Sequence, residues 1–96
     1  HNLRLEAFKI NPEKMTIKAK AHIQGIGWED YGIIKKDTII GTVGEGKRLE
    51  CLCFEGDFEY RVHVQNSGWT DWTKADGVAT MGTVGQALRI EAIQFR

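Results

Sequence analysis

The chain is an internal duplication, and this limits its possible folds more than any other feature of the sequence. Residues 22–54 align with residues 63–95 at a constant shift of 41 positions, without a gap. The recurring segments are His22-Ile23-Gln24 with His63-Val64-Gln65, Gly27-Trp28 with Gly68-Trp69, Gly41-Thr42-Val43-Gly44 with Gly82-Thr83-Val84-Gly85, and Arg48-Leu49-Glu50 with Arg89-Ile90-Glu91. Because short repeats bury their apolar faces against one another, the duplication predicts a pseudo-symmetric assembly around a shared core.

A third copy of the closing segment opens the chain, since residues 3–10 parallel residues 88–95. The chain therefore holds about two and a third repeats. A length of 96 residues suits one domain, so we expect a single domain over 1–96. Within it we assign a partial repeat that supplies only a closing strand (1–14), unit 1 (15–56) and unit 2 (57–96).

Alternating apolar and polar residues, separated by glycine, predict strands and no helix. The predicted strands are 3–10, 15–24, 48–54, 58–65 and 88–95. Glycine-rich turns are expected at Gly25–Gly27, Gly41–Gly46, Gly56-Asp57 and Asp76-Gly77. The expected fold is all-β, a pseudo-symmetric repeat domain of short antiparallel strands, prism-like or barrel-like.

The charge balance limits the classes of ligand. Thirteen Lys and Arg residues oppose thirteen Asp and Glu residues, so the formal net charge is zero and little long-range field attracts polyanions. We therefore expect no nucleic-acid partner. No apolar run approaches the roughly 20 residues that cross a bilayer, so we expect no membrane insertion. We also expect this chain to be part of a longer protein.

No catalytic or metal site is expected. The Arg and Glu residues of the closing segments share strand faces and fit structural ion pairs, and turn hydrogen bonding accounts for Asp30 and Asp71. Cys51 and Cys53 point to one face of a strand and are interpreted as small buried residues, because no further ligands stand at metal-binding spacing. We expect no cofactor and no enzyme activity.

The order of motifs in unit 2 resembles a known family. The run His63-Val64-Gln65-Asn66-Ser67-Gly68-Trp69-Thr70-Asp71-Trp72, followed by Asp76-Gly77, Gly82-Thr83-Val84-Gly85 and Leu88-Arg89-Ile90-Glu91, is similar to the clostridial hydrophobic repeat with its Gly-Trp signature, the ChW repeat. Unit 1 departs from the pattern with Tyr31 at the position of Trp72. The resemblance implies a secreted or cell-wall-associated Gram-positive protein that binds peptidoglycan or another surface polysaccharide, or a host or wall protein.

The aromatic residues are the first candidates for ligand binding, because an indole offers a flat apolar face to a sugar ring. Trp28 and Trp69 are alternatively large core anchors, and we favour that interpretation for them. Tyr31 and Trp72 are expected to be the more exposed pair, so the binding hypothesis depends mainly on them.

The repeated polar residues are the second candidates. His22, His63, Gln24 and Gln65 could bind sugar hydroxyls, or could instead satisfy backbone groups of the neighbouring loop. Asp30 and Asp71 complete the candidate set.

Lys14, Lys18 and Lys20 form a basic stripe on alternating positions. They could contact anionic wall polymers, although lysines that protect an edge strand from aggregation are the favoured interpretation.

Two functions remain open: a non-catalytic cell-wall or glycan-binding module, and a protein-interaction or spacer repeat.

Overall fold

The computed structural model describes residues 5–96, and within this range every regular element is a β-strand. The strands are β1 (Ala7–Phe8), β2 (Lys18–Ile23), β3 (Gly27–Ile33), β4 (Ile40–Gly41), β5 (Leu49–Val64), β6 (Gly68–Trp69), β7 (Thr73–Asp76), β8 (Met81–Gly82) and β9 (Ile90–Phe95). Every pairing between them is antiparallel. The predicted all-β class is confirmed, although the strands of residues 5–96 do not close into a barrel.

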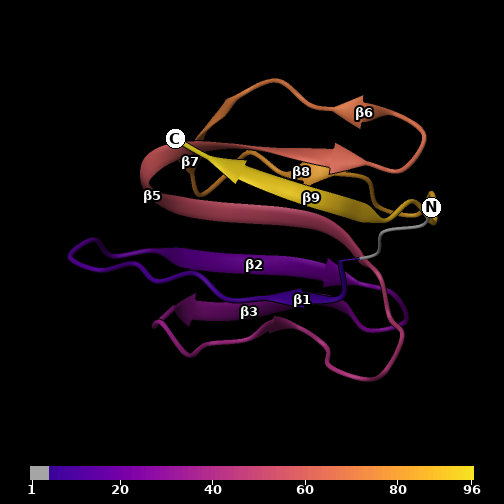
Figure 1. Cartoon of the computed structure of the whole chain (residues 1–96), viewed down its shortest axis with the longest axis horizontal. Helices are drawn as coiled ribbons and strands as arrows, with labels where there is room; N and C mark the ends of the chain where they lie inside the picture. Colours follow the sequence, from indigo (N-terminus) through magenta and orange to yellow (C-terminus); the bar gives the residue numbers. More distant parts are fainter. Residues whose placement is uncertain (1–4) are drawn as a thin grey trace.

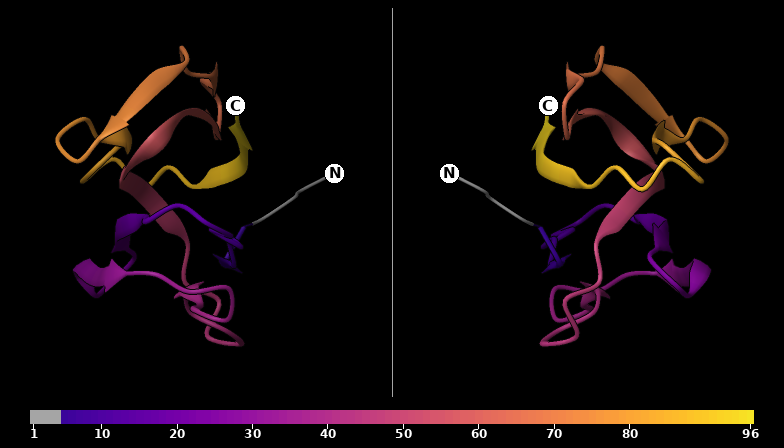
Figure 2. Two further views of the ribbon diagram at one scale, coloured as in Figure 1. Left: turned by 90° about the vertical axis from the view of Figure 1, so that its left-hand side faces the viewer. Right: turned by 90° about the vertical axis from the view of Figure 1, so that its right-hand side faces the viewer.

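Strand β5 connects the two units and organises the molecule (Figure 1). Its first half lies between β2 and β8, and its second half lies between β9 on one edge and β6 and β7 on the other. Figure 2 shows the two units on either side of this strand. The closing strand of unit 1 therefore continues directly into the opening strand of unit 2.

The turn predicted at Gly56-Asp57 is wrong, because β5 passes through these residues without ending. The strand bends there, and its register with β7 shifts between Glu55 and Glu59. Gly56 allows the bend, since a Cβ at this position would collide with the ring of Phe58. A Gly-Asp pair is a turn signal in sequence, but here strands on both sides of the bend keep the backbone extended.

The tandem copies occupy equivalent places in the fold. His22 pairs with Cys51 between β2 and β5, and His63 pairs with Ala92 between β5 and β9, with the same register shift directly after each histidine. The partial repeat obeys the same rule: β1 pairs with β4 as β5 pairs with β8. The pseudo-symmetry expected from the duplication is confirmed, including this register shift, although β3 of unit 1 is one strand and its counterpart in unit 2 is divided into β6 and β7.

The core lies between the units and is centred on Phe54 and Tyr60. Their rings meet edge to face with centroids 4.9 Å apart, and both are almost fully buried. The Tyr60 hydroxyl donates to the carbonyl of Leu52 and accepts from the amide of Phe54, and burial raises its pKa. Burying a side chain of this size stabilises the fold by about 1.5–3 kcal/mol. Unit 1 and unit 2 therefore share one core.

The cysteines and lysines show one correct and one wrong expectation. Cys51 and Cys53 are buried free thiols, as expected. Lys18 and Lys20 do not protect a sheet edge, because β2 pairs with β3 on one side and β5 on the other. Among the residues described, no helix is long and apolar enough to cross a membrane.

Candidate functional site

Each unit holds the same four-residue cluster beside its Gly-Trp motif. In unit 1, His22 Nδ1 lies 3.0 Å from Glu50 Oε1, and Arg48 Nε donates to Glu50 Oε2 at 2.9 Å. The His22 ring meets Trp28 edge to face, with centroids 5.4 Å apart. The histidine therefore links the indole to a buried carboxylate and holds the ring in place.

Unit 2 repeats this cluster. His63 Nδ1 lies 3.1 Å from Glu91 Oε1, Arg89 Nη2 lies 3.2 Å from Glu91 Oε2, and His63 contacts Trp69 at a centroid distance of 5.3 Å. These contacts give both histidines a structural role in orienting the tryptophans. They agree with the interpretation of the Arg and Glu residues as structural ion pairs.

The glutamines close the loops next to the histidines. Gln24 Oε1 accepts from the Arg48 amide at 3.1 Å, and Gln65 Oε1 accepts from the Arg89 amide at 3.3 Å. Both side-chain carbonyls thus satisfy backbone donors. Through these hydrogen bonds, Gln24 and Gln65 stabilise the loops beside the Gly-Trp motifs.

Trp28 and Trp69 lie at the surface, so the expectation of core anchors is wrong. Their exposed fractions are 44% and 40%. Phe54 and Tyr60 fill the core instead. The two indoles lie on the solvent-facing side of their strands, where part of each ring is accessible. Size alone does not separate a core tryptophan from a surface one.

Tyr31 and Trp72, the second aromatic pair, are half-buried and differ in role. The Tyr31 hydroxyl accepts from the Gly41 amide at 3.0 Å and braces β4. Trp72 instead lies between two guanidinium groups, 4.7 Å from Arg61 and 4.4 Å from Arg96. The position expected to be the more exposed aromatic is thus covered in both units.

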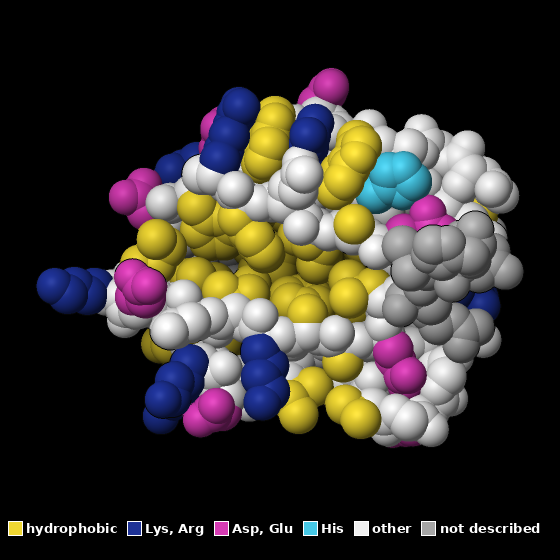
Figure 3. All heavy atoms as spheres, viewed as in Figure 1, with side chains coloured by type: hydrophobic (Ala, Val, Ile, Leu, Met, Phe, Trp, Pro, Cys, Tyr) yellow, Lys and Arg dark blue, Asp and Glu magenta, His cyan; other side chains and the backbone are white. Residues whose placement is uncertain are grey.

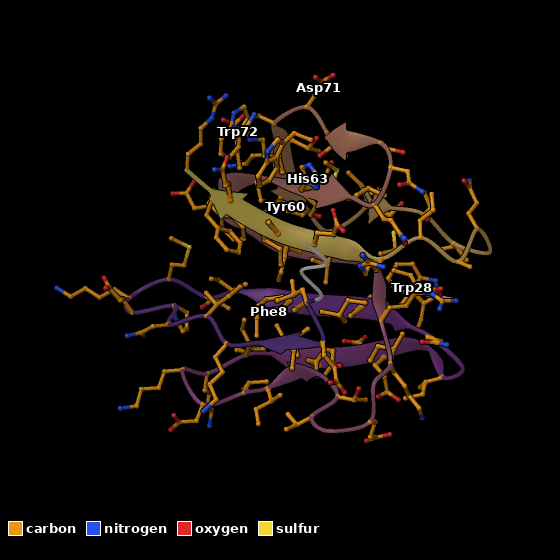
Figure 4. The ribbon with its side chains drawn as sticks, turned by 45° about the vertical axis from the view of Figure 1, so that its right-hand side comes forward. Phe8, Trp28, Tyr60, His63, Asp71 and Trp72 are labelled. Carbon is orange, nitrogen blue, oxygen red and sulfur yellow. The ribbon has the colours of Figure 1, made fainter. Side chains whose placement is uncertain are left out.

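The two aspartates lie in different settings, Asp30 within strand β3 and Asp71 in the loop between β6 and β7. Asp30 pairs with Lys20 at the point where the β2–β3 register shifts, and its Oδ1 accepts from the Gly32 amide at 2.9 Å. The expected local hydrogen bond to the backbone is present, but the expected position in a turn is wrong. Asp71 lies at the tip of the β6–β7 loop, and its side chain points away from the sheet (Figure 4). Its backbone carbonyl accepts from the Thr73 hydroxyl at 3.1 Å.

Unit 1 carries a groove that brings several of these residues together. Two adjoining hollows of ≈ 430 and ≈ 350 Å³ lie between the β2–β3 hairpin and the turn after β7. They share four lining residues, Lys20, Asp30, Cys53 and Gly77. We call them together the Trp28 groove, because Trp28 lines the larger hollow with Glu29, Val78 and Thr80.

The wall that unit 2 contributes to the Trp28 groove is a fixed turn. Asp76 Oδ1 accepts from the amides of Ala79 and Val78 at 2.8 and 2.9 Å, and these two bonds hold the pKa of Asp76 below its ordinary value. Val78 follows with 80% of its surface exposed. The Asp76-Gly77 pair predicts only a turn, and no local signal in the sequence indicates that this turn faces Trp28 across the sheet.

The floor of the groove is neutral. Cys53 is 7% exposed, and burial raises the pKa of its thiol, so the thiol remains protonated at neutral pH. Lys20, Glu29 and Asp30 supply charges of both signs at the rim.

On the equivalent surface of unit 2, the side chain of Arg61 covers the position of the groove. Arg61 stands where unit 1 has Lys20, and Gln94 stands where unit 1 has Cys53. Arg61 Nε donates to Gln94 Oε1 at 2.7 Å, and its guanidinium covers the Trp69 ring at 4.8 Å. Both units therefore have the Gly-Trp motif, but their surfaces differ in shape and charge.

Among residues 5–96, no group of three or more His, Cys, Asp or Glu side chains is arranged to hold a metal ion. No curated protein and no solved structure matches the chain. The sequence model described as Clostridial hydrophobic W matches twice, over residues 22–53 and 63–96, and these two ranges contain both Gly-Trp motifs and both histidine clusters. With its two matched units covering most of the sequence, the chain is a repeat module that belongs to the clostridial hydrophobic W (ChW) family.

Proposed function

We propose that this chain is a non-catalytic module that binds cell-wall or other extracellular glycan on behalf of a larger secreted Gram-positive protein. The observation that carries the proposal is the exposed indole of Trp28 at the wall of the Trp28 groove. A flat aromatic face beside hydrogen-bonding groups suits the mixed apolar and hydroxyl surface of a sugar ring.

The residues around Trp28 complete such a site. His22 packs edge to face against the Trp28 ring and limits its rotation, so little conformational entropy is lost when a ligand stacks on it. Lys20 can donate hydrogen bonds to hydroxyl oxygens, and Glu29 can accept them from hydroxyl groups, as can Thr80. The two hollows, ≈ 430 and ≈ 350 Å³, fall in the range of about 300–1,000 Å³ that small ligands occupy.

The test compares two tryptophans in equivalent places. Trp28→Ala is expected to weaken sedimentation of the chain with purified cell walls by about tenfold or more, as for a central aromatic contact. Trp69→Ala is the matched control and is expected to change wall binding much less, because Arg61 already covers its ring. Equal binding by folded Trp28→Ala and by the unaltered chain would exclude the groove as the site.

Walls stripped of polysaccharide separate a sugar ligand from a protein ligand. The proposal requires that the chain be retained by intact walls and lost from stripped ones. Retention by both would favour a wall protein as the partner.

Cys53 gives an independent probe of the same groove. A soluble wall glycan bound over the floor is expected to slow alkylation of the Cys53 thiol, which is the more accessible of the two cysteines. Cys51, at 1% exposure, serves as the internal reference. Unchanged alkylation at saturating glycan would contradict binding in the Trp28 groove.

A second candidate function is a structural repeat that assembles with other units, and strand β9 supports it. Phe54 is 1% exposed, whereas Phe95, its equivalent in unit 2, is 43% exposed. The difference arises because unit 2 covers the closing strand of unit 1, and within residues 5–96 no strand pairs with the outer edge of β9. In Figure 3, apolar side chains are exposed across the centre of the face on which β9 lies in Figure 1.

The occupant that fits this edge is a further unit of the same repeat. Twice within the described residues, a closing strand pairs with an apolar-Gly-Thr segment: β1 with β4, and β5 with β8. In both cases the threonine amide donates to the glutamate carbonyl, from Thr42 to Glu6 and from Thr83 to Glu50. The carbonyl of Glu91 holds the equivalent position in β9.

Hydrogen exchange tests this candidate. The Arg96 amide donates to Glu59, so by strand alternation the Ile93 amide faces away from β5. Appending another copy of residues 56–96 after Arg96 is expected to slow exchange of the Ile93 amide. The amide of Leu52, which faces β8 already, is the control and should be protected in both chains. An unchanged Ile93 rate would contradict docking of a further unit on β9.

A further inference from the structure

Unit 2 carries a ladder of stacked aromatic and cationic side chains that unit 1 lacks. His63 contacts Trp69, Arg61 lies over both Trp69 and Trp72, and Arg96 lies over Trp72. We call these five residues the Arg–Trp ladder. Alternating cationic and apolar side chains are visible along the upper edge of Figure 3, and Figure 4 places Trp72 and His63 on this side of the molecule.

Both arginines of the ladder are fixed through their Nε atoms. Arg61 Nε donates to Gln94 Oε1 at 2.7 Å, and Arg96 Nε donates to Glu59 Oε1 at 2.9 Å. Among residues 5–96, no hydrogen bond uses the terminal amino groups of either arginine. The indole rings cover the guanidinium faces, so the donors that remain lie at the outer edges.

The charge of Arg61 is not neutralised by a neighbouring acid. Its hydrogen-bond partner Gln94 is neutral, and within the described part of the chain Arg61 takes part in no ion pair. Glu59 compensates Arg96, and Asp57 is paired with Lys74 at 3.4 Å. Within the ladder, Arg61 therefore carries a positive charge that no ion pair neutralises, in a chain whose formal net charge is zero.

A guanidinium held in this way is prepared for an anion. Its planar fork matches the two oxygens of a carboxylate or a phosphate, and stacking between rings removes rotamer freedom that binding would otherwise cost. Covering both faces directs ligand hydrogen bonds to the edge.

We propose that the Arg–Trp ladder binds the anionic oxygens of an acidic polymer, with Arg61 as the principal contact and Arg96 as the second. The site is separate from the Trp28 groove and does not depend on it. Unit 1 cannot form the same site, because the positions of Arg61, Trp72 and Arg96 hold Lys20, Tyr31 and Glu55. The duplicated chain would thus recognise two kinds of chemistry with one scaffold.

The test measures binding of the intact chain to polygalacturonate, to poly(glycerol phosphate) and to uncharged dextran by titration calorimetry. The proposal expects binding to one or both acidic polymers, with affinity that falls as salt rises, and none to dextran. Binding to polygalacturonate alone identifies carboxylate as the ligand group, and binding to poly(glycerol phosphate) alone identifies phosphate. Binding to neither acidic polymer would overturn the proposal.

Charge-matched variants distinguish the ladder from general attraction. Arg61→Gln is expected to weaken binding by about tenfold, the size of one charge-assisted contact. Lys20→Gln removes the same charge from the equivalent position of unit 1 and should leave affinity nearly unchanged. Equal losses in the two variants would contradict a specific site.

Two further variants test the guanidinium geometry and provide an alternative if Arg61→Gln does not fold. Arg61→Lys keeps the charge but not the planar fork, so full affinity in this variant would contradict the guanidinium geometry. Arg96→Gln removes an exposed contact without disturbing the sheet, and it is used if Arg61→Gln does not fold; undiminished affinity in folded Arg96→Gln would then contradict the ladder. Trp28→Ala should retain acidic-polymer binding, so failure of the groove and failure of the ladder are observed separately.

Discussion

At the scale of single residues, the glutamate of each closing strand is used in different ways by the different units. Glu6 Oε2 accepts from the Thr42 hydroxyl, the Glu45 amide and the Gly46 amide at 2.8–2.9 Å. Its counterpart Glu50 is turned toward His22 and Arg48. One consequence is visible at Thr83, the counterpart of Thr42, whose buried hydroxyl has no hydrogen-bond partner.

A matched pair of substitutions tests this difference. Thr83→Val removes an unsatisfied hydroxyl while keeping the shape of the side chain, so we expect the free energy of unfolding to rise by up to about 1 kcal/mol. Thr42→Val removes a hydrogen bond to a carboxylate and should lower the free energy of unfolding by about 1 kcal/mol. Urea unfolding measures both. Similar destabilisation in the two variants would show that Thr83 has a partner after all.

The same carboxylate predicts a pH dependence. The amide of Glu45 and the hydroxyl of Thr42 hold the pKa of Glu6 below its ordinary value of 4.5, and backbone amides do the same for Asp76, whose ordinary value is 3.8. A pKa lowered by folding stabilises the fold above the ordinary value, and this stabilisation is lost as the pH falls through the folded-state value.

We therefore expect thermal unfolding temperatures to decrease as the pH falls below 4.5. In Glu6→Gln the decrease should be smaller, because one of the two contributing carboxylates is gone. An unfolding temperature with the same pH profile in both proteins would contradict the role assigned to Glu6.

At the scale of elements, the short strands β4 and β8 depend on their glycines. Gly41 and Gly82 have φ angles of 108° and 120°, and a Cβ at either would collide with the backbone of the paired closing strand. Gly85 also has a positive φ, 81°, but its Cβ position is open.

Gly82→Ala is expected to cost more than about 2 kcal/mol, because strain and a backbone collision add. Gly85→Ala should cost about 1 kcal/mol, from its backbone conformation alone. Chemical denaturation of the two variants measures the difference. Equal costs would indicate that β8 can move away from β5 without loss.

The sequence predicted the elements that alternate clearly and missed those that depend on partners. Strands β2 and β9 lie inside predicted ranges, as do both halves of β5. Strand β3 was missed because Gly27 and Gly32 interrupt its pattern, and β4 and β8 were missed because two residues carry no periodicity. Their existence is set by tertiary pairing.

The candidate site was predicted in part. The repeated motif located Trp28 and Asp30, which line the groove, but Cys53 and Thr80 reach it only through the pairing of distant strands. The Arg–Trp ladder was not predicted, because Arg61 and Arg96 lie outside the segment 63–95 that repeats residues 22–54. A comparison of the two units therefore gives no signal at these two arginines.

At the scale of the whole molecule, the units are expected to unfold together. Leu52 is fully buried and pairs with Ala21 of unit 1 and Met81 of unit 2. Leu52→Ala should cost about 2–5 kcal/mol and destabilise both units equally.

Fluorescence reports the units separately. Trp28→Phe leaves the tryptophans of unit 2, and a double Trp69→Phe, Trp72→Phe variant leaves that of unit 1. We expect the urea midpoint from fluorescence to equal the midpoint from circular dichroism in each variant. A separate transition for one unit would contradict a shared core.

The unbroken course of β5 also sets a limit on motion. Proteins that adjust the distance between two contact areas usually do so at a hinge, where a loop absorbs the change in backbone angles. Here β5 runs from one unit to the other without a loop, and paired strands hold it on both sides of the bend, at Glu55 and at Glu59. We therefore expect the distance between the two units to stay constant. A polymer that contacts both units must then adapt its own shape to that distance.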